Sequence, residues 1–461
     1  MTDPLNFNQP TATHAEWTGA PTAGGTAAHR RGRLKRLLEL TQIYSGLDRR
    51  ALAKRLGRDP SRLIPESGNP GLDQLTAIAE VLDWPRSEVF RVLHGDSAEH
   101  STSDPIKALC QEVPSASEKF QDLSFRELGS KAVQAHQSSD NDLFREIASE
   151  LLHRSRNSAE RAHALCLFYS CFATQGMSVA ALNVIQQAAY QREVPESGRL
   201  NIQVNLATAH YNLCHLTEAR AVAADLIESV KQCTAKTKME RVVRAGALYI
   251  RGSTFRRMLA HEVDNRDQLC EQASQDLTKS HEELTEIARE FSDARHGGMA
   301  NTCTGALLEV HAASGTINAK AAIDQLDTGV RNAFSEGSNP VGIQLESWGW
   351  WAIFATNIAR RHLEGTERAN ALAKHARRIL KVANRLDNWT FRAAAYEALH
   401  LSDPNRAPWL ENPAELQLMI ETMGRLPVFR ETGWRILSDT GALERAAQID
   451  PRTWRKGLRC A

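Results

Sequence analysis

Aromatic residues and long hydrophobic runs are both scarce in this sequence. Aromatics make up 6% of the 461 residues, and the longest apolar stretch, 348–355, is far shorter than the ~20 residues that cross a bilayer. No basic start is followed by an apolar segment and a small-residue cleavage site, which is the pattern of a secretory signal. We therefore expect a cytoplasmic protein with no membrane partner.

Paired cysteines are missing as well. The eight cysteines are scattered, and none forms a Cys-x-x-Cys pair. Most fall within helical patterns, where a free thiol packs as a small hydrophobic side chain. This usage fits a reducing cytoplasm.

The short motifs of common enzyme classes are also absent. The sequence has no Gly-x-x-x-x-Gly-Lys-Ser/Thr phosphate loop, no Gly-x-Gly-x-x-Gly, no His-Glu-x-x-His and no Gly-x-Ser-x-Gly. Its sixteen histidines do not cluster with cysteines or carboxylates at metal-ligand spacing. Carboxylate pairs such as Glu282-Glu283 are expected on solvated helix faces. We predict a protein that is not an enzyme and that uses no cofactor or metal.

What the sequence does contain favours helices throughout. Ala, Leu, Glu, Arg and Gln are abundant, and these residues have high helix propensity. No segment has a convincing strand pattern, so the predicted fold class is all-α. Because 461 residues are too many for one core, we divide the chain into a disordered leader (1–28), a basic head (29–95), a linker (96–120), a helical-hairpin body (121–440) and a C-terminal tail (441–461).

Positive charge is concentrated in the head. Residues 30–62 contain eleven Lys or Arg and three Asp or Glu, a net charge of +8, so the rest of the chain carries −7 to give the overall +1. This distribution suggests an anionic partner for the head alone. On charge alone, a solvated basic surface is an equally good interpretation.

Five short helices with a shared core are predicted in the head. Apolar residues recur at helical spacing over 34–41, 52–56, 75–82 and 89–93. A further short helix is expected over 60–64, between the second and third of these ranges. Five such helices are an ordinary size for one small domain.

Capping signals define the second and third helices. Asp48 suits the N-cap of the second helix, and Gly57 suits its C-terminal end. Asp59 and Pro60 suit the start of the third helix. Pro65 disfavours helical geometry at the residue before it, so the third helix is expected to span barely one turn.

The order of these signals resembles the Cro/lambda-repressor, or XRE, type of helix-turn-helix. The resemblance rests on the run 48–57 (Asp-Arg-Arg-Ala-Leu-Ala-Lys-Arg-Leu-Gly), on the turn 66–70 (Glu-Ser-Gly-Asn-Pro) and on the apolar pattern of the closing helices. It covers about 65 residues, the size of one binding module. In that family the second helix of the motif enters the major groove and the first crosses the DNA backbone.

The resemblance implies a set of DNA-contacting residues. Arg58, Ser61 and Arg62 would face bases or adjacent phosphates. Arg49 stands where the family often has a glutamine that meets the duplex, and Arg50 lies beside it. Arginine suits either role, because its planar guanidinium can bind phosphate or guanine through two hydrogen bonds.

The body contains a weak internal repeat. Residues 206–226 place the apolar-small pair Leu206-Ala207 before a turn and Ala219 after it, and residues 168–188 show a similar pattern 38 residues earlier. This spacing resembles tetratricopeptide hairpins, in which small residues let paired helices approach closely. Gly315 is expected to end a further first helix and Gly365 to precede a second one. The resemblance implies a tetratricopeptide-like helical solenoid.

An aromatic cluster stands out within the body, at 348–354, with Trp389 and Phe391 further on. Trp348 and Trp351 share one helix face and could line a groove for a peptide or small ligand. The alternative, which we favour, is an aromatic core seam between hairpins. Gly349 allows close helix contact under either interpretation.

Together these features predict a DNA-binding transcriptional regulator. Its partners would be double-stranded DNA at the head and a peptide, ligand or protein on the body, which could also mediate homodimer formation. The domain order resembles that of peptide-sensing regulators with the same kind of head and a tetratricopeptide body. The alternative is a non-enzymatic interaction scaffold, in which a degenerate helix-turn-helix serves only for docking.

Overall fold

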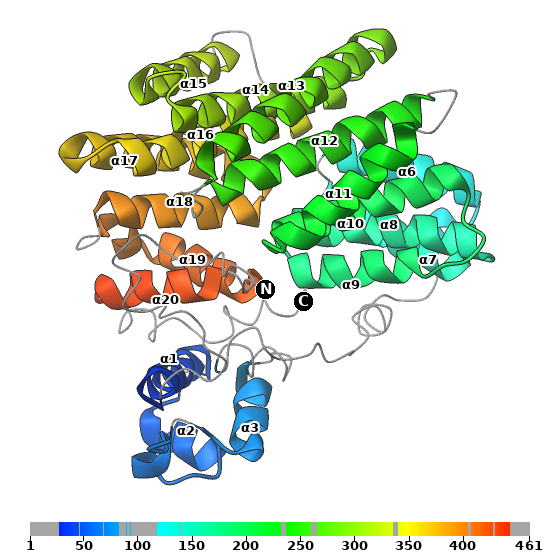
Figure 1. The fold of residues 1–461 in the computed structure, drawn as a ribbon. Coiled ribbons are helices and arrows are strands. Elements are labelled where there is room, and N and C mark those ends of the chain that lie inside the picture. Colours follow the sequence, from blue (N-terminus) through cyan, green and yellow to red (C-terminus); the bar gives the residue numbers. More distant parts are fainter. Residues whose placement is uncertain are drawn as a thin grey trace. The chain divides into compact units, whose positions relative to one another are not determined.

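The computed structural model describes residues 27–45, 47–67, 69–82, 118–138, 140–231, 237–259, 265–334, 340–403, 407–426 and 429–442, with positions 89 and 93. Every regular element in these ranges is a helix (Figure 1), which confirms the all-α prediction for them. Nearly all of the predicted leader, linker and tail lies outside the described residues. The chain divides into two compact units, one formed by 1–103 with 404–461 and the other by 104–403.

The head has its own small hydrophobic core. Its described elements are α1 (Ala27–Ser45), α2 (Arg49–Arg55), the 3-10 turn η2 (Pro60–Arg62) and α3 (Leu72–Leu82). Helix α1 contacts α2 and α3, and α2 contacts η2. The buried apolar side chains are those that periodicity predicts: Leu34, Leu37, Leu38, Leu52, Ala53, Leu56, Leu75, Ile78, Ala79 and Leu82. Most of the predicted fifth helix lies outside the described residues.

The predicted capping residues act where the sequence places them. The Asp48 side chain accepts a hydrogen bond from the backbone N–H of Ala51 at 2.7 Å. Gly57 follows α2 with a φ of +65°, a conformation that glycine adopts without strain. Asp59 caps η2, which is three residues long as Pro65 leads one to expect. That these elements form a helix-turn-helix stays a prediction.

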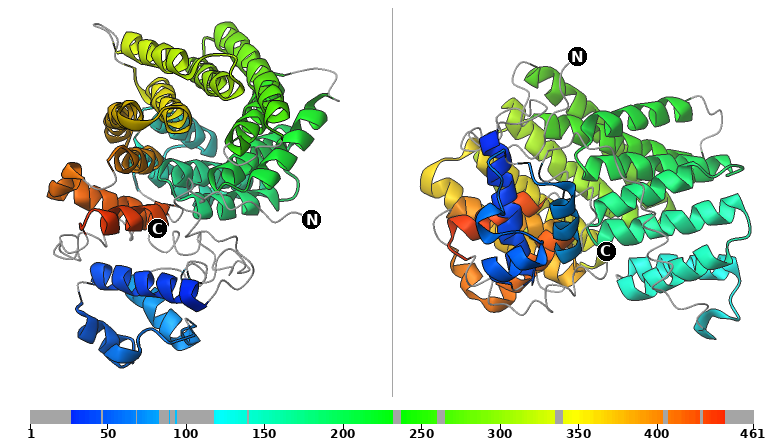
Figure 2. Two further views of the ribbon diagram at one scale, coloured as in Figure 1. Left: turned by 60° about the vertical axis from the view of Figure 1, so that its left-hand side comes forward. Right: turned by 90° about the horizontal axis from the view of Figure 1, so that it is seen from below.

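The second unit is a succession of packed helices. They are η3 (Glu118–Phe120), α6 (Phe125–Gln137), α7 (Asn141–Arg154), α8 (Ser158–Thr174), α9 (Ser178–Ala189), α10 (Glu196–Asn212), α11 (Leu216–Lys231), α12 (Lys238–Met258), α13 (Arg266–Phe291), α14 (Ala294–Ser314), α15 (Ala319–Ala333), α16 (Gly342–His362), α17 (Gly365–Leu386) and α18 (Trp389–Ser402). From α6 onward each helix contacts the next, and the even-numbered helices α8 to α18 also contact one another in order. The helices of this unit form a curved stack (Figure 2).

The hairpin turns lie where the sequence repeat predicts them. Gly176 joins α8 to α9 with a φ of +72°, and Gly315 ends α14 with a φ of +75°. Phe168 and Ala181 face the core on either side of the first of these turns. Helix α17 begins at Gly365, so the predicted second helix is present there too.

The C-terminal described elements are η4 (Pro408–Glu411), α19 (Pro413–Arg425) and α20 (Arg430–Asp439). Helix α19 contacts both η4 and α20, and Met419, Met423 and Trp434 are buried. In the described part of the chain, no helix combines the length and the hydrophobicity that crossing a membrane requires.

Candidate functional sites

The five residues predicted to contact DNA lie on neighbouring elements of the head. Arg49 and Arg50 open α2, Ser61 and Arg62 belong to η2, and Arg58 lies in the connection between them. All are exposed except Arg58, which is half-buried. The contact between α2 and η2 places these side chains in one region of the head.

Some of these side chains already have partners within the head. The Arg49 guanidinium donates hydrogen bonds to the backbone carbonyl of Pro60 at 3.2 and 3.3 Å, which ties the start of α2 to η2. Arg58 Nη2 lies 2.6 Å from Asp73 Oδ2 on α3. Ser61 donates its hydroxyl to Asp59 at 2.5 Å.

Two of the predicted contact residues, Arg50 and Arg62, are free to bind an anion. Within the described residues, the side chains of Arg50 and Arg62 make no hydrogen bond or ion pair. The Ser61 hydroxyl and backbone N–H, with the positive charge of Arg62, lower the pKa of the Asp59 carboxyl, so Arg62 lies near a negative charge although it forms no ion pair with it. An exposed guanidinium can bind phosphate at little desolvation cost. Of the five predicted contact residues, Arg50 and Arg62 are therefore the two whose guanidiniums are exposed and not paired with another described residue.

The two tryptophans predicted to line a groove occupy different environments. Trp351 is buried, and its Nε1–H donates to the backbone carbonyl of Asn301 at 2.7 Å. A Cβ added at Gly305 on α14 would lie 2.7 Å from the Trp351 ring, so these two helices approach closely. A Cβ added at Gly349 on α16 would likewise clash with the ring of Phe391 on α18. Trp351 thus packs in a core seam between hairpins.

Trp348 lies at the edge of that seam. Its ring meets the Trp351 ring edge-on, with centroids 4.8 Å apart. It is partly exposed and lines an open pocket of about 520 Å³ together with Asn301, Gln344 and Ser347. Asn301 donates a hydrogen bond to Ser347 across this pocket at 2.9 Å. Trp348 is the one member of the pair placed to touch a ligand.

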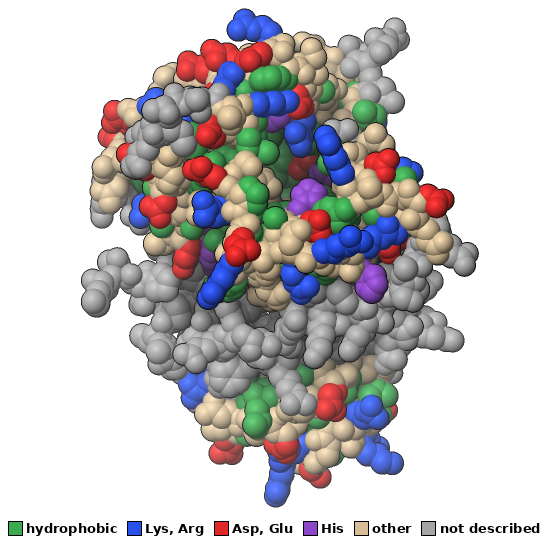
Figure 3. Space-filling model, turned by 90° about the vertical axis from the view of Figure 1, so that its right-hand side faces the viewer, with side chains coloured by type: hydrophobic (Ala, Val, Ile, Leu, Met, Phe, Trp, Pro, Cys, Tyr) green, Lys and Arg blue, Asp and Glu red, His purple; other side chains and the backbone are tan. Residues whose placement is uncertain are grey.

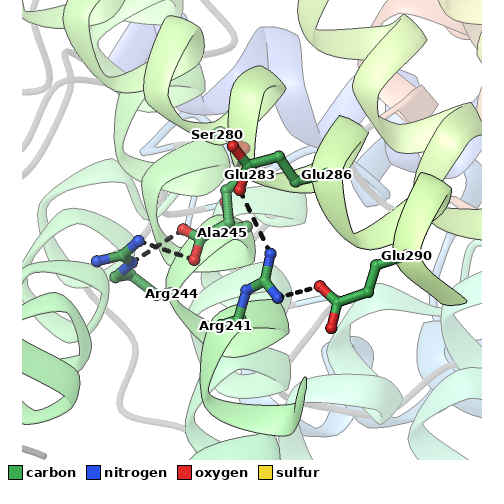
Figure 4. A network of polar contacts seen from close by, with 7 residues as sticks. All are labelled: Arg241, Arg244, Ala245, Ser280, Glu283, Glu286 and Glu290. Atoms are coloured by element: carbon green, nitrogen blue, oxygen red, sulfur yellow. Dashed lines mark hydrogen bonds and ion pairs between the residues drawn. The ribbon is translucent and has the colours of Figure 1, made fainter. Parts of the chain in front are cut away.

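Ion pairs of two arginines of α12 with three glutamates of α13 join these helices (Figure 4). Arg244 donates two hydrogen bonds to Glu283 at 2.8 and 2.9 Å, and Arg241 lies between Glu286 and Glu290. Glu283 is only 6% exposed, so the expectation of a solvated face is wrong for this residue, although Glu282 beside it is exposed. Both oxygens of Glu283 accept hydrogen bonds from one guanidinium, so this carboxylate is paired within the hairpin.

A second charged group is more deeply buried, and sequence reasoning missed it. Arg256 on α12 donates to Glu309 on α14 at 2.5 Å and to the Tyr211 hydroxyl at 3.1 Å. Arg256 is 4% exposed and Glu309 is 1% exposed. Arg361 on α16 places its Nη1 3.1 Å from the other Glu309 oxygen. Arg256, Glu309 and Arg361 lie on α12, α14 and α16. Their ion pairs therefore join these three helices.

Arg256 and Glu309 are 53 positions apart in sequence, so no local pattern predicts their pairing. Although burial opposes its charge, Glu309 and the nearby tyrosines raise the pKa of Arg256 further above its usual value. Burial, together with nearby arginines, lowers the pKa of Arg361. The Glu309 carboxylate therefore accepts a hydrogen bond from Arg256 but forms only an ion pair with Arg361.

The surface of the body contrasts with these buried groups. The face in Figure 3 carries Lys and Arg side chains interleaved with Asp and Glu in its described part. Because positive and negative side chains alternate, the electrostatic potential over this face is not strongly positive or negative. This face does not suit a polyanion such as DNA.

The described residues contain no group of three or more His, Cys, Asp or Glu side chains that could hold a metal ion. The cysteines that the structure describes are free, and Cys166, Cys171, Cys270 and Cys303 are buried, as a core role predicts. No protein-family model matches the chain, and no curated protein matches it in sequence.

Proposed function

We propose that this protein is a DNA-binding transcriptional regulator, with the head bound to double-stranded DNA and the body acting as the sensor. The observation that carries the proposal is the pair of exposed arginines, Arg50 and Arg62, which lack a hydrogen bond or ion pair to other described residues. They belong to a segment, 30–62, with a net charge of +8. Counter-ion release from DNA phosphates favours binding to such a segment.

The short η2 favours contacts with phosphates over reading of bases. A three-residue turn presents fewer side chains to the major groove than a full recognition helix does. The head would therefore bind DNA mainly through its backbone, and a homodimer would add specificity by spacing two heads on two half-sites.

The body is proposed to be a tetratricopeptide-like solenoid that receives a ligand, peptide or protein partner. The support is the ordered contact of its even-numbered helices, since stacked hairpins of this kind form extended binding surfaces. Trp348 and its pocket are one candidate position for such a partner.

Fluorescence anisotropy of the full-length protein on a mixed-sequence duplex tests the head. We expect affinity to fall steeply with salt, and the double variant Arg50→Ala/Arg62→Ala to flatten the plot of log K against log salt by up to ~2, because each phosphate that is no longer neutralised lowers the slope by about 0.9. Arg126→Ala, a change at an exposed arginine of the body, is the matched control and should leave the slope unchanged.

A second comparison separates a defined interface from general attraction. Arg62→Ala is expected to weaken binding more than Arg33→Ala, because Arg62 lies in η2 beside the proposed groove contact. Absence of binding at low salt, or equal binding by the double variant, contradicts the regulator and leaves the interaction scaffold.

A further inference from the structure

The pocket at Trp348 is lined by side chains of α14 and α16. Helix α16 contributes Gln344, Ser347 and Trp348, and α14 contributes Gly297 and Asn301. Gln344 and Trp348 are one helical turn apart, so their side chains are neighbours on one face of α16. The pocket has a volume of about 520 Å³, which lies within the range of small-molecule sites. It is therefore large enough for one small organic ligand.

The Trp348 ring gives this pocket a flat apolar surface. Its contact with the Trp351 ring is edge-on, with the ring planes inclined at 65° and the centroids 4.8 Å apart. An edge-on contact covers at most one face of the Trp348 ring. Because Trp348 is also partly exposed, part of its aromatic surface is accessible to a ligand that enters the pocket.

Two side-chain amides in the same pocket have unused hydrogen-bonding groups. The Gln344 amide makes no hydrogen bond to another described residue. The Asn301 amide donates one N–H to the Ser347 hydroxyl at 2.9 Å, and its oxygen accepts no hydrogen bond from the described residues. Each amide presents a donor and an acceptor side by side. The pocket thus offers uncharged groups of both kinds next to the aromatic ring.

Little unpaired charge faces the pocket. Among its described lining residues none is Lys or Arg, and Asp293 is the one acidic residue. Lys238 Nζ and Arg295 Nη2 lie 3.6 and 3.7 Å from Asp293 Oδ2. His296 Nδ1 lies 3.0 Å from the same oxygen. Because this carboxylate already has cationic partners, the pocket suits an uncharged ligand better than a phosphate or an amine.

We propose that this pocket binds adenine, as the free base or as part of adenosine. The base is flat and uncharged, and it stacks on Trp348 as bases do on aromatic side chains. Asn and Gln amides recognise adenine through two hydrogen bonds, whereas guanine is bound mainly by Arg or Lys. Gln344 and Asn301 therefore favour adenine. The role of the ligand as a signal rests on the proposed function, but its binding does not depend on DNA binding by the head.

Adenine and adenosine are the probes, and the full-length protein is titrated with each by calorimetry and thermal unfolding. At a ligand concentration about 100-fold above the dissociation constant, the melting temperature is expected to rise by about 5 °C. Trp348→Ala should weaken binding about fivefold or more, whereas Trp348→Phe keeps an aromatic face and should lose less. Gln344→Ala should weaken binding about tenfold. Gln203→Ala, a change at an exposed glutamine of α10, is the matched control and should leave binding unchanged.

A variant that fills the pocket tests its location without removing a ligand contact. A Cβ at Gly297 has its nearest neighbour, Ala288 of the same pocket, at 3.8 Å, so Gly297→Leu should fold and lose adenine binding. Circular dichroism of each variant without ligand establishes that it is folded.

The outcomes separate this site from the head. Arg50→Ala/Arg62→Ala should retain adenosine binding while losing DNA affinity, so failure of one proposal can be told from failure of the other. Guanosine should bind at least tenfold more weakly than adenosine. The site is overturned if neither adenine nor adenosine binds up to its solubility limit, if guanosine binds as tightly, or if Trp348→Ala and Gln344→Ala both bind adenosine as the wild type does.

Discussion

Glu309→Gln is expected to destabilise the body strongly although it hardly changes the shape of the side chain. It is 1% exposed and lies 2.5 Å from Arg256 and 3.1 Å from Arg361. Glu309→Gln keeps the volume but removes the negative charge, which leaves two buried guanidiniums without a counter-ion. Removing one partner of a buried pair costs about 3–5 kcal/mol, and we expect a fall in melting temperature of roughly 10 °C.

Thermal unfolding of the full-length protein, followed by circular dichroism, measures this loss. Glu282→Gln is the matched control, since Glu282 is exposed on α13 and its change should stay within about 0.5 kcal/mol. The double variant Glu309→Gln/Arg361→Gln should recover part of the loss, because it removes one of the uncompensated cations. A Glu309→Gln protein as stable as the Glu282→Gln protein would refute the reasoning.

Three further predictions concern the head, the aromatic seam and the response to pH. Asp73→Asn should tighten DNA binding and steepen its salt dependence, because it releases Arg58 from its 2.6 Å ion pair and removes a negative charge; anisotropy measures this, and unchanged or weaker binding would contradict it. Gly305→Ala should destabilise the body by about 1–3 kcal/mol, because the new Cβ would lie 2.7 Å from Trp351 and 2.8 Å from Phe354. In thermal unfolding Gly297→Ala, whose Cβ meets nothing nearer than 3.8 Å, is its control, and equal stability of the two variants would argue against the close packing. Burial, with the nearby cations Arg378 and Lys374 and despite Asp327, lowers the pKa of His375 to about 4 from 6.5. The folded state therefore favours the neutral imidazole, and stability present above pH 6.5 should be lost as the pH falls towards 4, by up to about 3 kcal/mol. Melting temperatures between pH 7 and pH 5 test this, and His375→Gln should show a smaller decrease than the wild type.

Local signals predicted the caps and the buried faces of the described helices of the head. Asp48, Gly57 and Asp59 act within a few residues of their own position, so their effect can be read from adjacent sequence. Pro65 likewise predicted the shortness of η2. The apolar stripes predicted which side chains are buried, because helical spacing alone decides which residues share a face.

Contacts between different helices were not predictable in this way. Arg244 meets Glu283 across 39 positions, and Arg256 meets Glu309 across 53. A charged residue within a helix is usually exposed, and only the packing of α12 against α13 and α14 buries these partners. Local patterns could therefore suggest a groove at Trp348, but they contain no sign of the buried charges of Arg256, Glu309 and Arg361.

DNA binding by the head can be measured in the cell by crosslinking the full-length protein to DNA, immunoprecipitating it and sequencing the DNA that comes with it. We expect discrete enriched sites that disappear in the Arg50→Ala/Arg62→Ala variant at equal protein abundance. Recovery of no DNA above a mock precipitation, or the same sites with the variant, would contradict it.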